Sequence, residues 1–577
     1  MKKPDFTRYY DYAELTAILK EMVEEKSDLA KMYSIGKTYE GRDMWMVEIT
    51  NQSKGCADKK PAMYIDGNHH AGEVTGSAVC LYTVWHLLSN YGKDCFVTGL
   101  VDDKTWYILP RISIDGAEMF LHTPYQMRSS VREWPKRDND DGLNPEDIDG
   151  NGWILQMRVK DPEGDYKISN KDCRLMVKRE PWDKEGPFYR MYQEGVVKNY
   201  DGGEVKMAQP KWSLDINRNY PANWEPDVVQ RGAGPYPLSE PETRSVANFI
   251  VGHPNIVGGM SYHTTMGAIL RPSCTKPDSK LPPVDVLIYK TIGAKGKELT
   301  GYPDISTYED YTTDKEHPLK GVFMDWLYEH MGIITFSTEL WDASVRAGNK
   351  LLDRRGRNAE DSQLALLTWN DREIASQGFV KWYEVDHPQL GKVELGGWKT
   401  KFVLTNPPPQ FLEGECHKNC MFTLYHAACL PQVDVEKVMV EKLAEGLYKV
   451  KAVVTNESFM PTYGCQMAVN AGKSKPVTVE LKVAGETVGE AADPAAGSAA
   501  GSTTGALSFV TGKPKQEIGH LPGLAGGGRG GMGWYGGSTP GNHKDVEWIV
   551  RAKIDTKVAV VAESMKAGED KVEVTLE

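Results

Sequence analysis

The chain of 577 residues has the length of roughly three to four domains, so it can bury a large core without disulfide bridges. With 40% hydrophobic, 26% charged and 10% aromatic residues, its composition excludes a disordered or collagen-like chain. A formal charge of -12 argues against nucleic acid as a partner, since phosphate backbones call for a basic surface. No apolar run approaches the roughly 20 residues that cross a bilayer, so no membrane span is expected.

The first 375 residues alternate short apolar runs with helical patterns, which is typical of an α/β domain. The pattern predicts a mixed, mostly parallel sheet with flanking helices. Its buried strands are expected at 62–66, 106–109, 255–262 and 332–338. The clearest helix is expected from Glu73 to about Ser89, where apolar residues recur at helical spacing. A polar stretch over 134–211 interrupts the pattern and is predicted to be an inserted surface excursion.

A different pattern follows residue 375. We interpret 376–430 as a connecting extension and 431–577 as an all-β, sandwich-like domain, because its apolar residues alternate along short runs. The range 491–542 within it is rich in glycine, alanine and serine and is predicted to be a loop. The nine cysteines are too few and too scattered to form a disulfide framework. The compartment stays open: secreted or periplasmic if a signal peptide was removed, otherwise cytoplasmic.

The insertion carries an acidic run that resembles the start of a calcium-binding loop. Carboxylate and amide oxygens are the ligands that calcium prefers. The candidate ligands are Asp138, Asp140, Asp147, Asp149 and Asn151. Arg158 stands where an EF-hand has its last glutamate, which argues against that motif. A calcium site and a solvated cluster of acidic turns are therefore two open interpretations.

The chemically informative residues follow three of the predicted strands. His70 and Glu73 have the spacing His-x-x-Glu, which lets an imidazole and a carboxylate reach one cation while a further ligand comes from elsewhere. Alone this spacing is weak, because a helix-capping glutamate explains it as well. His263 and Glu339 follow two other strands, at the edge where open α/β sheets build their sites. Since a carboxylate in an apolar run is costly unless it has partners, the combination indicates a metal site.

These motifs resemble, in order and in sheet context, those of zinc carboxypeptidases of the carboxypeptidase A-like metallopeptidase family. The resemblance covers roughly residues 7 to 342 and includes a leader at 34–43 and the segment 215–219. It implies a catalytic domain over 1–375, in which a zinc ion is bound by His70, Glu73 and His263. Asp215 is then expected to hold the first histidine in its correct tautomer.

The resemblance also implies roles in catalysis. Glu339 is expected to be the general base that takes a proton from the attacking water. The oxyanion is expected to be stabilised by a guanidinium, for which Arg128 and Arg132 are both candidates and Arg128 is preferred. Asn217 and Arg218 are expected to bind the terminal carboxylate of the substrate, a task that suits the planar fork of arginine.

Two further positions concern the substrate. Met324 falls near the pocket for the C-terminal side chain, which favours an apolar or aromatic residue there. His317 stands where relatives have a mobile tyrosine that covers the substrate, and Tyr308 or Tyr311 are alternative replacements.

The sequence thus predicts a zinc peptidase that acts on the C-termini of peptides or proteins. One alternative keeps the metal chemistry but acts on cell-wall peptides or as an amidohydrolase. Another is a binding protein whose catalytic domain has decayed, and Glu339 argues against it.

Overall fold

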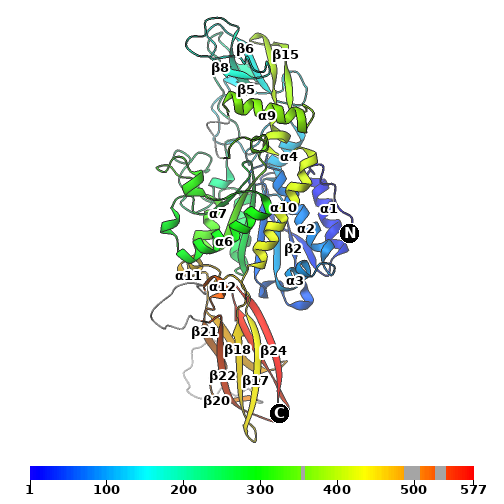
Figure 1. Ribbon diagram of the computed structural model, residues 1–577, viewed down its shortest axis with the longest axis vertical. Helices are drawn as coiled ribbons and strands as arrows, with labels where there is room; N and C mark the ends of the chain where they lie inside the picture. Colours follow the sequence, from blue (N-terminus) through cyan, green and yellow to red (C-terminus); the bar gives the residue numbers. More distant parts are fainter. Residues whose placement is uncertain (352–357, 486–506, 527–540) are drawn as a thin grey trace.

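An eight-stranded mixed sheet forms the centre of the molecule (Figure 1). This computed structural model describes residues 1–351, 358–485, 507–526 and 541–577. In spatial order the strands are β1 (Ala30–Lys37), β2 (Asp43–Ile49), β4 (Thr105–Leu109), β3 (Ala62–Gly67), β11 (Ile256–Thr264), β14 (Ile334–Leu340), β12 (Ala268–Arg271) and β13 (Asp304–Ser306). The four central strands β4, β3, β11 and β14 run parallel. The predicted mixed, mostly parallel sheet is confirmed, and its four central strands are those expected from the sequence.

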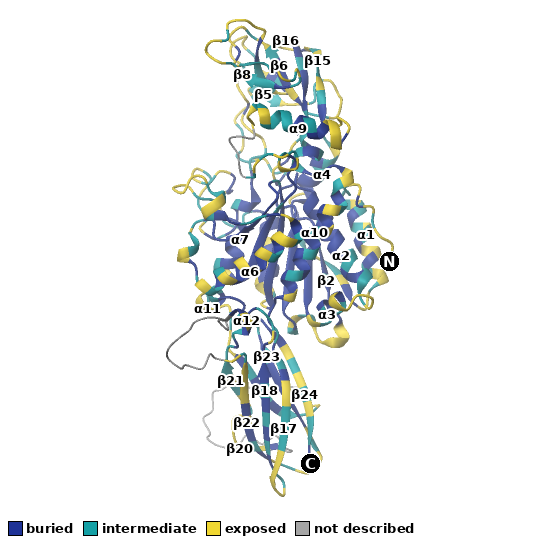
Figure 2. Cartoon of the chain, viewed as in Figure 1, coloured by how far each residue is buried: buried dark blue, intermediate teal, exposed yellow. Residues whose placement is uncertain are grey.

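Helices cover both faces of this sheet. They are α1 (Tyr12–Glu25), α2 (Thr75–Asn90), α3 (Cys95–Asp103), α4 (Ile114–His122), α5 (Pro241–Gly252), α6 (Pro283–Thr300) and α10 (Pro409–Ala428). Along β3, Met63 and Ile65 pack into one apolar cluster with α2, α6 and α10, whereas Tyr64 packs into a second cluster with α5. A strand that is buried on both faces has this pattern. Figure 2 shows the resulting buried centre and the exposed loops around it.

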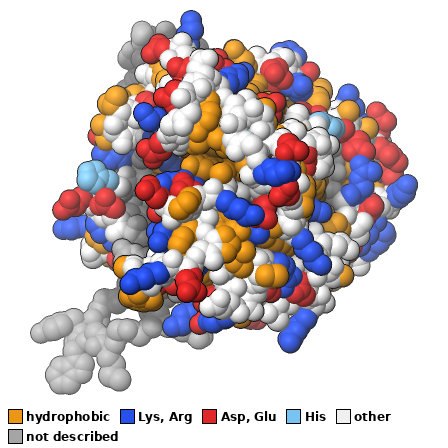
Figure 3. All heavy atoms as spheres, turned by 90° about the horizontal axis from the view of Figure 1, so that it is seen from above, with side chains coloured by type: hydrophobic (Ala, Val, Ile, Leu, Met, Phe, Trp, Pro, Cys, Tyr) orange, Lys and Arg blue, Asp and Glu red, His pale blue; other side chains and the backbone are white. Residues whose placement is uncertain are grey.

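The polar insertion forms part of a second sheet at one end of the molecule (Figure 1). Its order is β15 (Phe379–His387), β16 (Gly391–Trp398), β6 (Gln156–Lys160), β9 (Phe188–Gln193), β7 (Tyr166–Ile168) and β8 (Met176–Lys178). Within the insertion, β5 (Gly142–Pro145) and β10 (Gly195–Lys198) form a separate two-stranded antiparallel sheet. On the face seen from above, Lys and Arg side chains alternate with Asp and Glu (Figure 3).

The segment 376–430 does more than connect two domains. Its strands β15 and β16 complete the sheet of the insertion. Its helix α10 packs against α2 and α6, and Leu412, Cys416 and Phe422 of α10 are fully buried in the main core. The segment is therefore more than a connection, because residues 394–396 pair with residues 156–158, more than 200 positions earlier in the chain, as Glu394 does with Arg158.

The C-terminal part consists of two four-stranded antiparallel sheets, which confirms the predicted all-β domain. The first has the order β17 (Asp434–Ala444), β18 (Leu447–Thr455), β22 (His543–Ala552) and β20 (Leu507–Thr511); the second has β21 (Lys515–Gly519), β19 (Val477–Val483), β23 (Thr556–Ser564) and β24 (Gly568–Leu576). Inward residues of both, such as Val450, Trp548 and Val560, share one core.

The glycine-rich range 491–542 is only partly described. Residues 491–506 and 527–540 lie outside the described residues. Between them, β20 and β21 are strands, although the sequence predicts a loop throughout this range. The reason is local: Leu507 is buried in the sandwich core, and β20 pairs with β22. Among the described residues, no helix has the length and apolar character that a membrane crossing needs.

Candidate metal centre

The turn between β3 and α2 presents two of the predicted metal ligands. Asn68 has a positive φ of 61°, which asparagine tolerates better than most residues. Its amide group donates to the carbonyls of His70 (3.0 Å) and Ala71 (3.1 Å) and so closes the turn. A Cβ atom on Gly67 would lie 2.5 Å from the backbone of Gly76, so only glycine allows the strand and the helix to approach this closely. The turn directs His70 and Glu73 inward.

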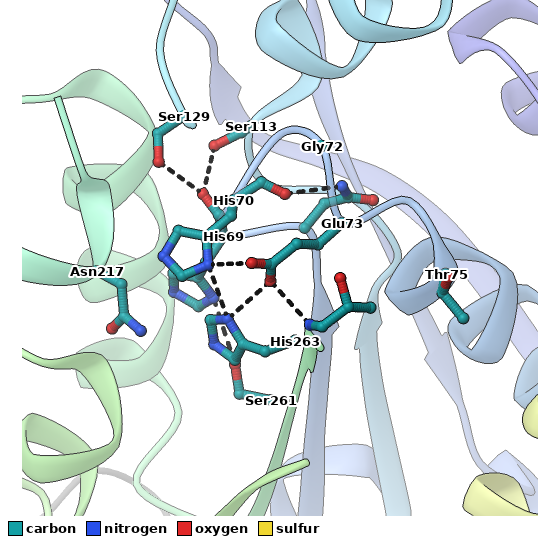
Figure 4. A network of polar contacts seen from close by, with 12 residues as sticks. His69, His70, Gly72, Glu73, Thr75, Ser113, Ser129, Asn217, Ser261 and His263 are labelled. Atoms are coloured by element: carbon teal, nitrogen blue, oxygen red, sulfur yellow. Dashed lines mark hydrogen bonds and ion pairs between the residues drawn. The ribbon is translucent and has the colours of Figure 1, made fainter. Parts of the chain in front are cut away.

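Three donor atoms face one another at this edge of the sheet (Figure 4). His70 Nδ1 lies 2.8 Å from Glu73 Oε1, and His263 Nδ1 lies 3.2 Å from Glu73 Oε2. The two Nδ1 atoms of His70 and His263 are 3.1 Å apart. His263 is on β11, the strand next to β3, and all three side chains are buried. The structure therefore brings together the three residues that the sequence predicts as one ligand set.

The chemistry of this donor set fits zinc. Nitrogen and carboxylate ligands lie about 2.0–2.2 Å from zinc, so two ligands of a tetrahedral ion are separated by about 3.3 Å. The two Nδ1 atoms are 3.1 Å apart, close to that value, and they lie 2.8 and 3.2 Å from the two different oxygens of Glu73. Two imidazoles and one carboxylate are also a common set in catalytic zinc sites, where a fourth position is left for water.

Asp215 binds His70 through the ring nitrogen that faces away from the other two ligands. It precedes the short helix η3 (Ile216–Arg218), and its Oδ1 accepts a hydrogen bond from His70 Nε2 at 3.1 Å. With its proton on Nε2, His70 turns the lone pair of Nδ1 toward the other two donors. Burial alone would raise the pKa of Asp215, but the guanidinium groups of Arg128 and then Arg218 hold that pKa well below its usual range. Asp215 is therefore an ionised acceptor.

His263 has a similar support that the sequence analysis missed. Its Nε2 lies 3.4 Å from Ser261 Oγ, and this hydroxyl donates to Asp66 Oδ1 at 2.7 Å. His69 Nδ1 lies 3.3 Å from the same carboxylate oxygen. Asp66 is fully buried on β3. The sequence does contain a signal for Asp66: it is a carboxylate inside an apolar strand, and the same argument singles out Glu339.

Glu339 lies beside the three donors on the next strand. On β14 it is the register partner of His263 on β11. Burial and then the nearby carboxylate of Glu73 raise its pKa. Within the described part of the chain, no hydrogen bond joins the Glu339 carboxylate to another group. It is therefore free to accept a proton from a molecule bound at the cluster.

The two candidate arginines have different partners. Arg128 donates to Asp215 Oδ2 from Nε (3.0 Å) and Nη2 (2.8 Å), and its Nη1 lies 3.4 Å from Glu73 Oε1. Nearly half of its side-chain surface remains exposed. Arg132 instead pairs with the buried carboxylate of Glu240, at 2.5 and 2.9 Å. Of the two, the structure brings only Arg128 to the cluster.

Asn217 and Arg218 lie next to Asp215 at the same edge. Asn217 Oδ1 accepts a hydrogen bond from the backbone N–H of Phe323 at 2.9 Å, which directs its amide group toward the site. Arg218 Nη1 donates to the carbonyl of Asn217 at 2.7 Å. Across the described residues, Arg218 forms no ion pair with a carboxylate, unlike Arg128 and Arg132.

The remaining predicted substrate residues lie in different surroundings. Met324 is buried in an apolar cluster with Met266, Leu270 and Ile305. His317 lies on the surface, with 78% of its side chain exposed and its Nδ1 2.9 Å from Asp314 Oδ2. Its ring makes no contact with the three donors among the residues that the structure describes.

Calcium binding by the insertion is not supported. Asp147 and Asp149 lie near Glu194, but the oxygens of Asp147 accept hydrogen bonds from the backbone of Gly150, Asn151 and Gly152 at 2.8–3.1 Å. Asp140 forms an ion pair with Lys198 instead. The side chain of Asn151 binds Asp149 and Tyr383. Among the described residues, Asp138 does not belong to the cluster of Asp147, Asp149 and Glu194. The predicted ligands are thus occupied by the loop itself and by neighbouring side chains.

Two family models match separate parts of the chain. The model described as zinc carboxypeptidase matches residues 15–351, which is more than half of the chain. A second model, described as a domain of unknown function, matches residues 432–575 in the β-sandwich.

Individual proteins match over smaller parts. Mast cell carboxypeptidase A of Rattus norvegicus is 22% identical over 345 residues, or 58% of this chain and 65% of that protein. A zinc carboxypeptidase of Saccharothrix mutabilis subsp. capreolus is 28% identical over 131 residues, or 23% of this chain and 29% of that protein. The chain thus spans less than two thirds of either relative. Among solved structures, bovine thrombin-activatable fibrinolysis inhibitor in complex with tick carboxypeptidase inhibitor is similar, with 16% identity, 73% of this chain and 97% of that chain covered, and a TM-score of 0.41.

Proposed function

This chain belongs to the zinc carboxypeptidase family, and on that premise we propose that it is a zinc-dependent peptidase that removes residues from the C-terminal ends of peptides. His70, Glu73 and His263 would hold the ion, since their donor atoms converge at suitable separations. A bound zinc ion would polarise the scissile carbonyl and acidify a water molecule.

Glu339 moves the proton in this proposal. Its carboxylate takes a proton from the attacking water and delivers it to the leaving amine. The raised pKa of Glu339 suits both steps. A pKa closer to neutral pH lets the same carboxyl group accept a proton in one step and release it in the next. Arg128 supports the negative charge that develops on the carbonyl oxygen, since its partly exposed guanidinium borders the cluster.

One observation carries the preference for chain ends: among the described residues the guanidinium of Arg218 forms no ion pair with a carboxylate, although it lies one residue from Asn217 and three from Asp215 in the sequence. A guanidinium without a carboxylate in an ion pair, beside a catalytic cluster, is suited to bind a carboxylate through two hydrogen bonds. The side-chain NH₂ group of Asn217, whose Oδ1 already accepts from Phe323, provides a further donor. Both groups would bind the carboxylate of the C-terminal residue.

The buried apolar cluster around Met324 supports an apolar or aromatic C-terminal side chain. Met266, Leu270 and Ile305 line the same region and carry no charge. A C-terminal side chain that binds against this cluster would therefore be favoured if it is apolar.

A comparison of matched peptides tests the preference for chain ends. We expect the wild-type protein to cleave a peptide that ends in a free carboxylate at least about 100-fold faster, in kcat/KM, than the same peptide with a C-terminal amide. The variant Arg218→Met should remove most of this preference by slowing only the free acid. The variant Arg244→Met is the matched control, since Arg244 lies on the outer helix α5. Equal cleavage of both peptides by the wild type would exclude an exopeptidase and favour an amidohydrolase.

A second experiment tests the general base. Glu339→Gln should reduce kcat by about 10²–10⁴-fold and leave zinc bound, because the residue is not a ligand in this proposal. Unchanged hydrolysis by Glu339→Gln would remove Glu339 from the mechanism. Absence of hydrolysis in the wild type, with zinc bound, would instead favour the decayed binding protein.

A further inference from the structure

Asn406 touches the metal-binding turn from a distant part of the chain. It follows the π-helical segment η8 (Thr400–Thr405) and directly precedes the prolines that begin α10. Its Nδ2 donates to the carbonyls of Gly72 (2.7 Å) and Lys401 (2.9 Å). Its Oδ1 accepts from the backbone N–H of Thr75 (3.1 Å) and from the Thr75 hydroxyl (2.8 Å). The side chain is fully buried, and each of its donor and acceptor positions has a partner.

Two of the three residues that the Asn406 side chain binds, Gly72 and Thr75, lie on either side of Glu73 in the sequence. The N–H group of Gly72 donates to the carbonyl of Met127 at 3.0 Å, while its own carbonyl accepts from Asn406. Gly72 is therefore fixed from both sides. On the other flank, Thr75 begins α2, and the preceding residue Val74 has no side chain that can cap the helix. Asn406 supplies this cap from 331 positions away in the sequence.

Asn406 is itself held by a second tie to the catalytic domain. Its backbone N–H donates to the carbonyl of Lys401 at 3.1 Å. The buried ammonium group of Lys401 donates to the carbonyls of Phe120 (2.6 Å) and Thr123 (2.5 Å) at the end of α4. The ring of Phe120 lies directly under Gly72, where a Cβ atom would approach it to 3.1 Å. The segment 400–406 is thus joined to the turn and to the helix beneath it.

We propose that Asn406 is a positioning residue that fixes the backbone on both sides of Glu73 and thereby sets where this carboxylate meets the metal. The inference rests on the proposed zinc site. Without the amide, the carbonyl of Gly72 and the N–H of Thr75 lose a buried partner, and the turn moves to find others. A displaced turn carries the Glu73 carboxylate away from His263. Groups that orient ligands in this way typically change metal affinity by about 10–100-fold when they are replaced.

The test is the zinc affinity of full-length Asn406→Asp, measured by competition with a chromogenic chelator. Aspartate keeps the acceptor for Thr75 but cannot donate to Gly72. The matched control is Asn456→Asp: Asn456 is also fully buried and donates to the carbonyls of Met460 (3.0 Å) and Leu521 (3.4 Å), at the junction with the β-sandwich. Both variants should lower Tm, and only Asn406→Asp should weaken zinc binding, by about 10–100-fold.

The outcomes separate this inference from the proposed function. Wild-type zinc affinity in Asn406→Asp, together with a lowered Tm, means a structural role only and overturns the inference. If Asn406→Asp does not fold, Thr75→Val decides, because it removes the hydroxyl that binds Asn406 Oδ1 and keeps the backbone N–H. Weaker zinc binding by Thr75→Val supports the inference and unchanged binding overturns it. A wild-type protein that takes up no zinc refutes the proposed function itself.

Discussion

Two clusters of possible cation ligands stand out in the described residues, and they differ in where their donor atoms point. The first consists of His70, Glu73 and His263 and is buried at the edge of the central sheet. The second consists of Asp147, Asp149 and Glu194 in the inserted module. In both, the donor atoms lie within 4.8 Å of one another. Proximity therefore does not distinguish them.

The difference lies in the groups around the donors. Behind the buried cluster, Asp215 and Ser261 bind the Nε2 atoms of the two histidines, so the Nδ1 atoms stay available. In the buried cluster one backbone N–H, that of Thr264, donates to Glu73 Oε2 at 3.0 Å, whereas in the acidic cluster backbone N–H groups occupy both oxygens of Glu194, from Ile148 (2.9 Å) and Leu155 (2.7 Å). Carboxylates that hold a loop together have fewer lone pairs left for an ion. A metal site needs partners that bind its ligands on the side away from the metal and so orient them.

Removing one donor from each cluster tests, with the largest expected effect, whether only the buried cluster binds zinc. Glu73→Gln should lose most of its zinc and more than about 10³-fold in kcat/KM, because a bound ion supplies several kcal/mol of transition-state stabilisation. Asp147→Asn should keep both zinc and activity. Metal content by mass spectrometry and peptide hydrolysis measure the two effects. Equal zinc content in Glu73→Gln and wild type would contradict the ligand assignment.

A smaller effect is expected from the group behind the ligands. In Asp215→Asn a neutral amide replaces the carboxylate that accepts from His70 Nε2. The histidine therefore loses its fixed tautomer and part of its basicity. Zinc affinity should fall by about 10–100-fold, measured by chelator competition. The variant Asp227→Asn is a suitable comparison. Asp227 accepts from the N–H of Gly232 at 2.8 Å near Asp215, but among the described residues it makes no contact with His70, Glu73 or His263. A full loss of zinc would mean that Asp215 acts as a ligand.

The sequence allowed prediction of those parts of the site that depend on local order. His70 and Glu73 follow β3, while His263 and Glu339 lie at the C-terminal ends of β11 and β14. Parallel strands end at one edge of a sheet, so the meeting of these residues follows from the topology. The central sheet and the β-sandwich were predictable for the same reason, because apolar periodicity is local.

Other contacts depend on residues far apart in the sequence. Asn406 and Gly72 are 334 positions apart, and nothing near Asn406 indicates its partner. Similarly, Arg128 and Arg132 differ only in the carboxylate that each one reaches, Asp215 or Glu240. Such choices follow from packing and cannot be read from spacing.

The pH dependence of stability tests whether Glu194 of the acidic cluster is protonated in the folded protein. Burial raises the pKa of Glu194 to about 7, from an ordinary 4.5. Between these values the folded state retains a proton that the unfolded state has released, so the free energy of unfolding falls as pH rises through this window. Glu194→Gln cannot ionise. Its Tm relative to wild type should therefore rise between pH 4.5 and pH 8, as measured by thermal melts.

The exposed Glu163→Gln is the control for this measurement, and its Tm relative to wild type should be the same at both pH values. If Glu194 were held as an anion by a bound cation, the Tm difference between Glu194→Gln and wild type would change in the opposite direction.

The smallest effect is expected from calcium. A ligand that binds only the folded state at 100 times its Kd stabilises a protein by about 2.7 kcal/mol, which raises Tm by several degrees. Because the acidic oxygens already accept backbone N–H groups, millimolar calcium should move the Tm by less than about 1 °C. A larger rise that disappears in Asp149→Asn would show that the loop reorganises around an ion. Backbone hydrogen bonds to the carboxylates would then not be enough to exclude an ion from the acidic cluster.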